Sequence, residues 1–258
     1  MRKLLIVLFS VLIFSTGFTR NQIIVGVIES PPYFEEKRPE GQGMVCELVT
    51  AAFHITGYEV IYEFYPLTRL LDTLIDGKVA CIVRDIAPEE REQFIVSKPI
   101  YLSENVLFYK KSKFPSGIDF KDLTELKRYT FGIKNGSELT IKLLNDKGLT
   151  VDLANSSEQL FIKLNMDRTD FAVATDIGGL EILKIMNLNR DDFGYTKFIS
   201  SSKRSMIFLK NSRNEKIISD FNIGYKTIMK NGTYKNILEK YYGAGKVPVN
   251  VLNLVNEW

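Results

Sequence analysis

Charged side chains crowd into one short stretch of this 258-residue sequence, directly after a predicted strand. The stretch "RDIAPEER" holds Arg84, Asp85, Glu89, Glu90 and Arg91. A guanidinium beside the free amides of a helix start suits a carboxylate, because its fork donates two parallel charge-assisted hydrogen bonds. A solvated charged turn has the same composition, so the stretch alone leaves both interpretations open.

Two further polar groups follow predicted strands later in the chain. "ATDIGG" places Asp176 at the carboxyl end of a strand, before two glycines that keep side chains out of the way. Such a carboxylate accepts hydrogen bonds from an ammonium group or caps the following helix. "KNGSE" places Ser137 at a helix N-terminus, where free amides suit an anion or a carbonyl.

Aromatic and basic groups occupy the matching loops of the first half of the chain. In "ESPPYF" two prolines end a strand, and two aromatic rings follow on a loop. Tyr33 and Phe34 either line a ligand site or pack the loop onto its own domain, and Tyr33 adds a hydroxyl to its apolar face. Arg69 falls in the first turn of a predicted helix, where the helix dipole disfavours a cation. It is therefore either solvated or turned toward an anionic ligand.

The elements that carry these residues alternate between strand and helix. Two successive β-α-β-α-β blocks are predicted, separated and followed by the extended segments 103–111 and 198–211, and a helical region, 215–243, breaks near Asn231-Gly232. The first block comprises strand 23–28, helix 43–55, strand 59–65, helix 67–77, strand 79–86 and a short helix 87–94. The second comprises strand 129–133, helix 137–146, strand 150–155, helix 156–166, strand 169–176 and helix 178–186.

This order predicts an α/β protein of two lobes, each a mostly parallel sheet flanked by helices. We expect residues 20–104 and 200–258 to form lobe 1 and residues 105–199 to form an inserted lobe 2, with two crossing strands as a hinge. Ligands of open α/β sheets bind beyond the carboxyl ends of the strands, so the polar loops should face an interlobe cleft. The tail 244–258 has alternating valines, which predict an edge strand or packing across the hinge.

The N-terminus predicts export. Arg2 and Lys3 precede an apolar run, 4–14, and small residues follow it, so residues 1–19 resemble a secretory signal peptide. A membrane span needs about 20 apolar residues, although an uncleaved anchor remains an alternative. We expect a periplasmic or otherwise extracytoplasmic protein. The net charge of +3 is dispersed along the chain, which argues against a nucleic-acid partner.

Cysteine and histidine are too scarce for most metal or nucleophile chemistry. Cys46 and Cys81 either pair, as an exported protein allows, or remain buried thiols. His54 is the only histidine, and it lies at the end of a predicted helix. We therefore expect no metal, no other cofactor and no catalytic residues.

The chain resembles the polar amino-acid-binding family of bacterial extracytoplasmic solute-binding proteins, family 3. The resemblance rests on the order and spacing of several stretches, and "YPLTR" resembles the family's Pro-Trp-x-Arg variant with Leu67 in place of Trp. The stretches are "VGVIESPPYF", "GMVCELVTAAFHITGYEV", "YPLTRLLDTLIDGKVA", "APEEREQFIVSKPIY", "GIKNGS", "DFAVATDIGG" and "NGTYKNILEKYYG". It implies a type II periplasmic-binding-protein-like fold.

The resemblance also implies roles for individual residues. Tyr33 matches the loop aromatic, and Asp176 matches the aspartate that holds the ligand's ammonium group. The family's Thr-Pro-Glu-Arg motif falls on residues 87–90, which puts Glu90 in place of the arginine, whereas a slip of one residue recovers Arg91. Arg69 and Arg84 are the other candidates for a ligand carboxylate. The predicted ligand-binding set is Tyr33, Arg69, Asp85, Arg91, Ser137 and Asp176.

These features predict a monomeric receptor that captures a small polar solute, an amino acid or a related compound, and delivers it to the permease of an ABC transporter. The alternative is a dehydratase-like or lyase-like enzyme on the same fold, with Glu29, Asp85 or Glu90 as the reactive carboxylate. A sensor module is a third possibility, which the expected absence of a membrane span and a signalling domain disfavours.

Overall fold

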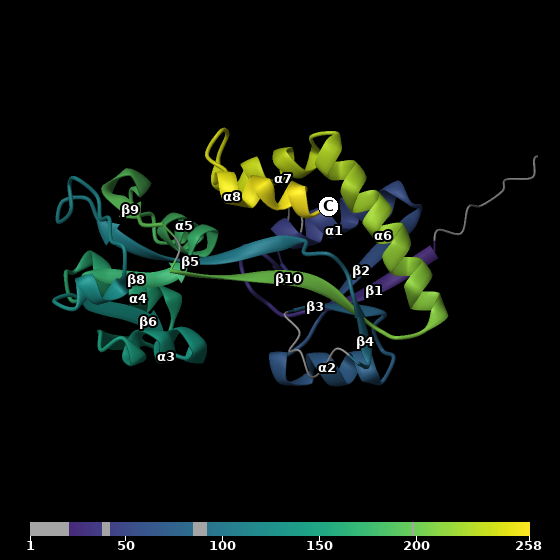
Figure 1. Ribbon diagram of the computed structural model, residues 1–258, viewed down its shortest axis with the longest axis horizontal. Coiled ribbons are helices and arrows are strands. Elements are labelled where there is room, and N and C mark those ends of the chain that lie inside the picture. Colours follow the sequence, from purple (N-terminus) through teal and green to yellow (C-terminus); the bar gives the residue numbers. More distant parts are fainter. Residues whose placement is uncertain (1–20, 38–41, 85–91, 198) are drawn as a thin grey trace, which may run out of the picture.

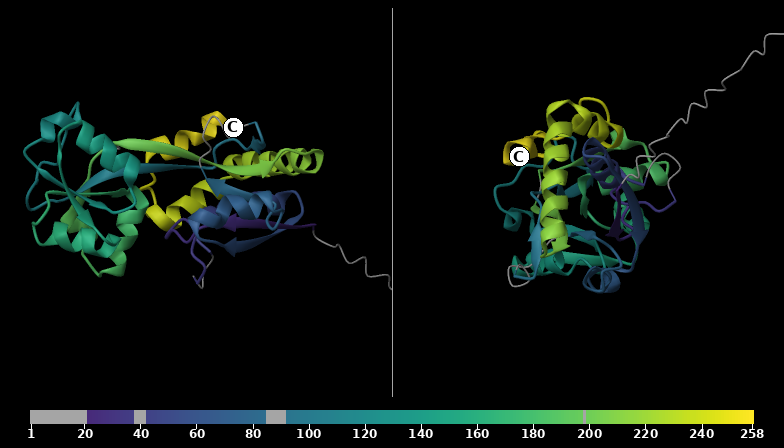
Figure 2. Two further views of the ribbon diagram at one scale, coloured as in Figure 1. Left: turned by 90° about the horizontal axis from the view of Figure 1, so that it is seen from below. Right: turned by 90° about the vertical axis from the view of Figure 1, so that its right-hand side faces the viewer.

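Two bodies lie side by side, joined by two long strands (Figures 1 and 2). The computed structural model describes residues 21–37, 42–84, 92–197 and 199–258. The joining strands are β5 (Tyr101–Lys110) and β10 (Ser200–Leu209), which pair antiparallel. The predicted signal peptide lies outside the described residues, as does most of the predicted helix 87–94, whose last residue begins strand β4 (Phe94–Val96).

The first body has a small parallel sheet covered by helices. Strand β1 (Asn21–Val27) pairs in parallel with β2 (Tyr58–Phe64) on one side and β3 (Cys81–Arg84) on the other. Its apolar core contains the buried faces of helices from both ends of the chain, so the C-terminal helices close the lobe that the N-terminal strand begins. These helices are α1 (Met44–Ile55), α6 (Ser212–Lys230) and α7 (Thr233–Tyr242), whereas α2 (Leu67–Ile75) packs in a second apolar cluster of the same body.

The second body repeats the parallel pattern. Strand β6 (Thr130–Lys134) pairs in parallel with β7 (Thr150–Ala154) and β8 (Phe171–Thr175). Two apolar clusters, formed by residues between positions 106 and 199, make its core. The remaining elements are β9 (Phe193–Tyr195), which pairs with β5, helices α3 (Glu138–Asp146), α4 (Ser157–Asn165) and α5 (Asp176–Ile185), and the 3₁₀ turns η2 (Leu123–Leu126) and η3 (Arg190–Asp192).

The two sheets are continuous rather than separate. The strand order is β2-β1-β3-β10-β5-β8-β6-β7, because one end of β10 pairs with β3 and β4 and its other end pairs with β5. The sequence predicts one sheet for each lobe, and this is where the structure differs. Ten residues give β10 enough length to serve both sheets, so the crossing strands are themselves part of the sheet.

Helix boundaries follow local signals in the sequence. The predicted break near Asn231-Gly232 is confirmed, since Gly232 adopts a φ of 86° between α6 and α7. Ser156 caps α4, its hydroxyl accepting a hydrogen bond from the Gln159 amide at 3.1 Å. Local residue types thus decide where these helices begin and end.

The tail is helical, so the prediction of an edge strand is wrong. Helix α8 (Val249–Leu252) and the 3₁₀ turn η4 (Asn253–Glu257) follow Pro248. Val251 and Leu254 are buried, whereas Val249 is 71% exposed. The apolar spacing is therefore three residues, which suits a helical turn better than a strand.

Both cysteines are buried free thiols, as one of the two interpretations predicted. Burial raises the pKa of the Cys81 thiol well above its ordinary value. His54 is exposed at the end of α1. Among the helices within the described ranges, none combines the length and apolar character of a membrane span.

Candidate interlobe binding site

The loop that carries Tyr33 is fastened to the start of α1. The amides of Met44 and Val45 donate to the carbonyls of Pro32 and Tyr33 at 2.9 and 3.0 Å, so the loop supplies partners for first-turn amides. Gly43 permits this approach, because a Cβ there would lie 2.5 Å from the Tyr33 carbonyl oxygen. The ring of Tyr33 is thus held by a rigid loop.

Tyr33 is buried rather than exposed on a cleft wall. Its ring is 5% exposed and stacks on Tyr101 of β5, with ring centroids 5.1 Å apart. Its hydroxyl has no hydrogen bond of good geometry among the described residues, although the Thr175 and Ser103 hydroxyls lie close enough to act on its pKa. Phe34 is also buried and packs the loop onto the lobe 1 core.

Asp176 is the first residue of α5, directly after β8. It is 1% exposed, its Oδ2 accepts a hydrogen bond from the Tyr242 hydroxyl at 2.7 Å, and its Oδ1 has no partner among the described residues. Burial raises the pKa of the Asp176 carboxyl to about 6, whereas the hydrogen bond from Tyr242 lowers it. The backbone amides of Ile177 and Asp176 lie close enough to lower the pKa as well, although neither makes a hydrogen bond of good geometry with Oδ1. At neutral pH this site therefore holds a desolvated negative charge with one free oxygen.

The start of α5 approaches β5 closely because Gly179 has no side chain. A Cβ at Gly179 would lie 2.2 Å from the Phe108 ring of β5. The sequence predicts that the two glycines of "DIGG" keep side chains out of the way. At Gly179, the missing side chain makes room for the Phe108 ring.

Phenol rings and a second carboxylate surround Asp176. Its charge raises the pKa values of Tyr33, Tyr195 and Tyr242 after burial, which places all three phenols near it. Glu104 of β5 is 5% exposed, accepts a hydrogen bond from the Asn250 amide, and adds to the rise in the pKa of Asp176. An aromatic surrounding with two carboxylates suits a cationic guest.

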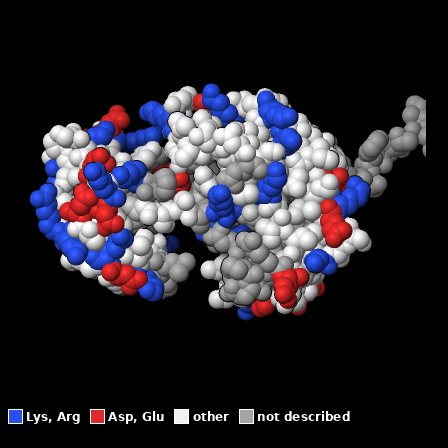
Figure 3. Space-filling model, in the orientation of Figure 1, with Lys and Arg blue, Asp and Glu red and all other residues white. Residues whose placement is uncertain are grey.

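The other predicted ligand residues are placed differently. Arg69 is exposed on α2, and Ser137 is partly buried before α3, without a side-chain cap on that helix. Those helices stand on opposite sides of the hollow that separates the lobes in the space-filling view (Figure 3). Asp85 and Arg91 lie outside the described residues. The structure therefore brings Tyr33 and Asp176 together, from opposite lobes.

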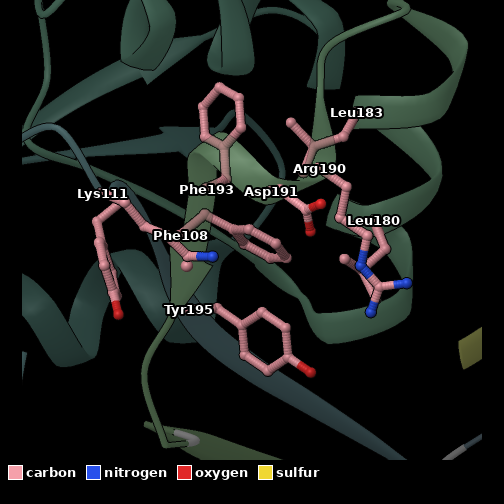
Figure 4. A pocket seen from close by; sticks show the side chains of 10 residues that line it. Phe108, Lys111, Leu180, Leu183, Arg190, Asp191, Phe193 and Tyr195 are labelled. Atoms are coloured by element: carbon pink, nitrogen blue, oxygen red, sulfur yellow. The ribbon is translucent and has the colours of Figure 1, made fainter. Parts of the chain in front are cut away.

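A separate cavity of about 230 Å³ lies on lobe 2, between α5 and β9 (Figure 4). Arg190 and Tyr195 line it together with apolar side chains that include Leu180 and Leu183. The Arg190 guanidinium also donates to the Tyr242 carbonyl oxygen at 3.2 Å. The cavity therefore adjoins the contact between α7 and α5.

Tyr242 and Glu104 were not predicted as site residues. Tyr242 is the second tyrosine of the stretch "EKYYG", and Glu104 lies in a strand expected only to cross between lobes. Nothing local marks either residue, because each reaches Asp176 through the packing of elements far apart in the chain. Among the described residues, no cluster of three or more histidine, cysteine, aspartate or glutamate side chains is arranged to hold a metal ion.

Two α/β lobes joined by two strands, with a buried polar site between them, define the class of hinged solute-binding proteins. Residues 23–244 match the family of bacterial extracellular solute-binding proteins, family 3. The chain belongs to this family, and the resemblance found in the sequence is confirmed. The α/β two-lobed fold class is confirmed as well.

Solved structures of similar fold include three informative ones. A substrate-binding protein of a polar amino acid ABC uptake transporter from Streptococcus thermophilus has 21% identity and a TM-score of 0.68, with 89% of each chain covered. An ancestral arginine-binding protein bound to arginine has 22% identity and a TM-score of 0.60, covering 87% of this chain and 99% of its own. A histidine kinase sensor domain has 18% identity and a TM-score of 0.62, covering 87% and 97%. The sequence comparison with curated proteins finds no match.

Proposed function

We propose that the protein is an extracytoplasmic receptor that captures an amino acid or a related small polar solute between its lobes and delivers it to the permease of an ABC transporter. The family and the transporter-linked protein of similar fold support this role. The receptor is a monomer that reaches the periplasm or cell exterior through the signal peptide at residues 1–19, and binds neither nucleic acid nor a cofactor.

The observation that carries the proposal is the state of Asp176. Its Oδ1 is buried without a hydrogen bond among the described residues, and a buried carboxylate oxygen without a partner is costly. An ammonium group that enters the site supplies both the missing hydrogen bond and the missing positive charge. Ligand binding thereby offsets the desolvation cost of the buried Asp176 carboxylate.

Tyr33 provides the opposing surface from lobe 1. We place the lobe boundaries at 104/105 and 199/200, so that a ligand held by both residues ties the lobes together. Ser137 and one of the arginines at positions 69, 84 and 91, with Asp85 beside them, complete the site when the lobes close. An arginine in that closed cleft takes the ligand carboxylate through two parallel hydrogen bonds.

The receptor role is preferred over an enzyme. A lyase-like reaction needs a carboxylate aimed at the substrate. Of the carboxylates considered for that role, Glu29 accepts the Glu36 amide at 3.0 Å, so its oxygen is engaged in bracing its own loop. Asp85 and Glu90 lie outside the described residues. We therefore propose that bound solute leaves the protein chemically unchanged.

Thermal-shift screening tests the proposal. The protein without residues 1–19 is screened against L-arginine, L-glutamine, L-glutamate, other amino acids, amines, organic acids and short peptides. A ligand that binds only the folded state raises the apparent stability with the logarithm of its concentration. We expect a shift with at least one compound that carries an ammonium group, and recovery of that compound with unaltered mass.

Two variants separate the site from general effects. Asp176→Ala should abolish the shift, whereas Asp146→Asn, an exposed change on α3 of the same lobe, should retain it. An undiminished shift in Asp176→Ala would remove that residue from the site. A compound recovered with a changed mass would favour the enzyme instead.

A further inference from the structure

Tyr242 links the two lobes through its side chain. It ends α7, is 1% exposed and packs within the lobe 1 core. Its hydroxyl nevertheless donates to Asp176, which begins α5 in lobe 2, at 2.7 Å. A tyrosine ring in an apolar core requires a partner for its hydroxyl, and here that partner is the ionisable group of the candidate site.

The same residue is anchored from lobe 2 a second time. Arg190 of η3 donates to the Tyr242 carbonyl oxygen at 3.2 Å, where the end of α7 leaves carbonyl groups without helical partners. Ile177, the neighbour of Asp176, is 1% exposed and belongs to the lobe 1 core cluster. These contacts fix the end of α7 against the start of α5. The position of the Tyr242 side chain is therefore restricted, and its hydroxyl stays directed at Asp176.

We propose that Tyr242 is the positioning residue for Asp176: its phenol occupies Oδ2, fixes the plane of the carboxylate and reserves Oδ1 for the cationic group of the ligand. This inference rests on the proposed function, because it takes Asp176 as the ligand's anchor. The two oxygens of one carboxylate thereby have different tasks. One is satisfied by the protein from lobe 1, and the other stays without a partner until the solute arrives.

The hydrogen bond from Tyr242 also keeps the carboxylate ionised. Burial favours the protonated acid and Glu104 adds to that effect, whereas a donated hydrogen bond favours the charged form. Without the phenol, Asp176 would hold its proton to a higher pH and would present a neutral acid to an ammonium group. Tyr242 thus acts on ligand affinity through the charge of Asp176 as well as through its orientation.

Other titratable and charged groups lie on the elements that pack against α5, including Lys235, Glu239 and Lys240 of α7. Tyr33 faces Asp176 from the loop after β1, Tyr195 from β9 and Glu104 from β5, and Arg190 lies in η3. On α4, which also packs against α5, Lys163 is paired with Asp152 at 2.7 Å and Glu158 is exposed at the helix start. Strand β8 carries no titratable side chain, and α5 itself adds Glu181 and Lys184.

The test is the titration of Asp176 in the ligand-free protein, followed by the ¹³C NMR shift of its carboxyl carbon and assigned with Asp176→Asn. Tyr242→Phe keeps the ring and removes the hydroxyl. We expect the midpoint of Asp176 to rise by about one pH unit or more, as loss of a charge-assisted hydrogen bond predicts. An unchanged midpoint overturns the proposal.

Tyr234→Phe is the matched control. Tyr234 lies on the same helix, is 3% exposed, and its hydroxyl donates to a neutral group, the Val251 carbonyl oxygen, at 3.2 Å. This variant loses a buried tyrosine hydroxyl without touching Asp176, so the midpoint of Asp176 should stay where it is. Equal midpoint shifts in both variants would mean a general loosening of the fold and would contradict the proposal.

A measurement on the unaltered protein covers the case in which Tyr242→Phe does not fold. The ring carbon that bears the Tyr242 hydroxyl should change its NMR shift with the same midpoint as Asp176, near pH 6, because the two groups share one hydrogen bond. A Tyr242 signal that stays constant while Asp176 titrates overturns the proposal.

Ligand affinity supplies the second arm. For whichever of L-arginine, L-glutamine or L-glutamate binds, Tyr242→Phe should weaken binding about twofold or more at pH 7, because a midpoint near 7 leaves about half of Asp176 neutral, and the deficit should narrow by pH 9 as Asp176 ionises. Tyr234→Phe should bind normally, and an equal loss in both variants counts against the proposal. If no compound of the thermal-shift screen binds, the receptor function fails, while the ligand-free titration still decides the role of Tyr242.

Discussion

At the scale of single residues, the chemistry centres on one buried carboxyl. Asp176 begins α5 on lobe 2 and accepts a hydrogen bond from the phenol of Tyr242 on lobe 1, and the phenols of Tyr33 and Tyr195 lie near it. Its raised pKa means that the folded protein binds this proton more tightly than the unfolded chain does. A cationic ligand would lower the free energy of ionising this carboxyl, and this gain contributes to ligand binding.

That cost should appear in the stability of the empty protein. For a group whose folded pKa is raised from about 3.9 to about 6, the stabilisation is complete below pH 4 and is lost as the pH rises through 6. Between pH 4 and pH 8, the unfolding free energy of the wild type should therefore fall by about 2.5 kcal/mol relative to Asp176→Asn. Urea denaturation at a series of pH values measures this difference. Asp146→Asn, exposed on α3, should run parallel to the wild type, and a parallel course for Asp176→Asn would contradict the assignment.

The hydroxyl of Tyr33 makes a second residue-level prediction. Because it is buried without a well-formed hydrogen bond among the described residues, Tyr33→Phe should change the unfolding free energy by less than about 1 kcal/mol. Tyr33→Ala should cost about 3–5 kcal/mol, since it empties a packed site beside Tyr101. If ligand contacts the hydroxyl, Tyr33→Phe also binds solute more weakly, which calorimetry measures. A large stability loss in Tyr33→Phe would mean that the hydroxyl already has a partner.

At the scale of elements, the tail 244–258 packs on lobe 1 and contacts the crossing strand β5. Trp258 donates from its indole nitrogen to the Pro99 carbonyl oxygen at 2.7 Å and packs on Tyr225 of α6, and Asn250 donates to Glu104 on β5. Residues 245–258 lie beyond the part of the chain that matches the family. The tail therefore adds contacts to a crossing strand that the matched region alone does not contain.

Removing the tail's anchor should weaken lobe 1. Trp258→Ala deletes an aromatic contact and a hydrogen bond, and we expect a loss of about 2–4 kcal/mol in the free energy of unfolding. Val249→Ala changes a side chain that is 71% exposed on the same tail and should alter stability by less than about 0.5 kcal/mol. Denaturant titration of both variants tests the contrast, and a neutral Trp258→Ala would show that the tail is not fastened there.

Local signals predicted the elements well and their meeting points poorly. The apolar spacing of Val45, Leu48, Val49 and Ala52 predicts α1, and these residues are all buried. The edge strand was predicted wrongly because the valines at 247, 249 and 251 alternate as in a strand. Pro248 before α8 and the buried Leu254 are instead consistent with a helical turn.

Among the site residues, Tyr33 and Asp176 were predicted, and both lie at the interlobe contact. Tyr242 was not, because its role depends on where the end of α7 meets α5, some 66 residues away along the chain. That distance leaves no periodicity or motif to detect. Long-range packing is thus what sequence patterns alone leave open.

At the scale of the whole molecule, two bodies share a hinge of two strands and a polar site that draws on both. Tyr33 and Tyr242 come from lobe 1 and Asp176 from lobe 2. A ligand bound at Asp176 would therefore contact both lobes. The account therefore predicts binding and lobe closure as one event, which depends on a single carboxylate.

Native mass spectrometry tests most directly whether solute binding depends on this carboxylate. The protein lacking residues 1–19 is unfolded in denaturant to release any carried solute, refolded, and incubated at pH 7.5 with an equimolar mixture of amino acids and small amines. We predict one retained compound per protein molecule, bearing an ammonium group, in the wild type and in Asp146→Asn, and none in Asp176→Asn. Retention of the same compound by Asp176→Asn, or of no compound by the wild type, would contradict the account.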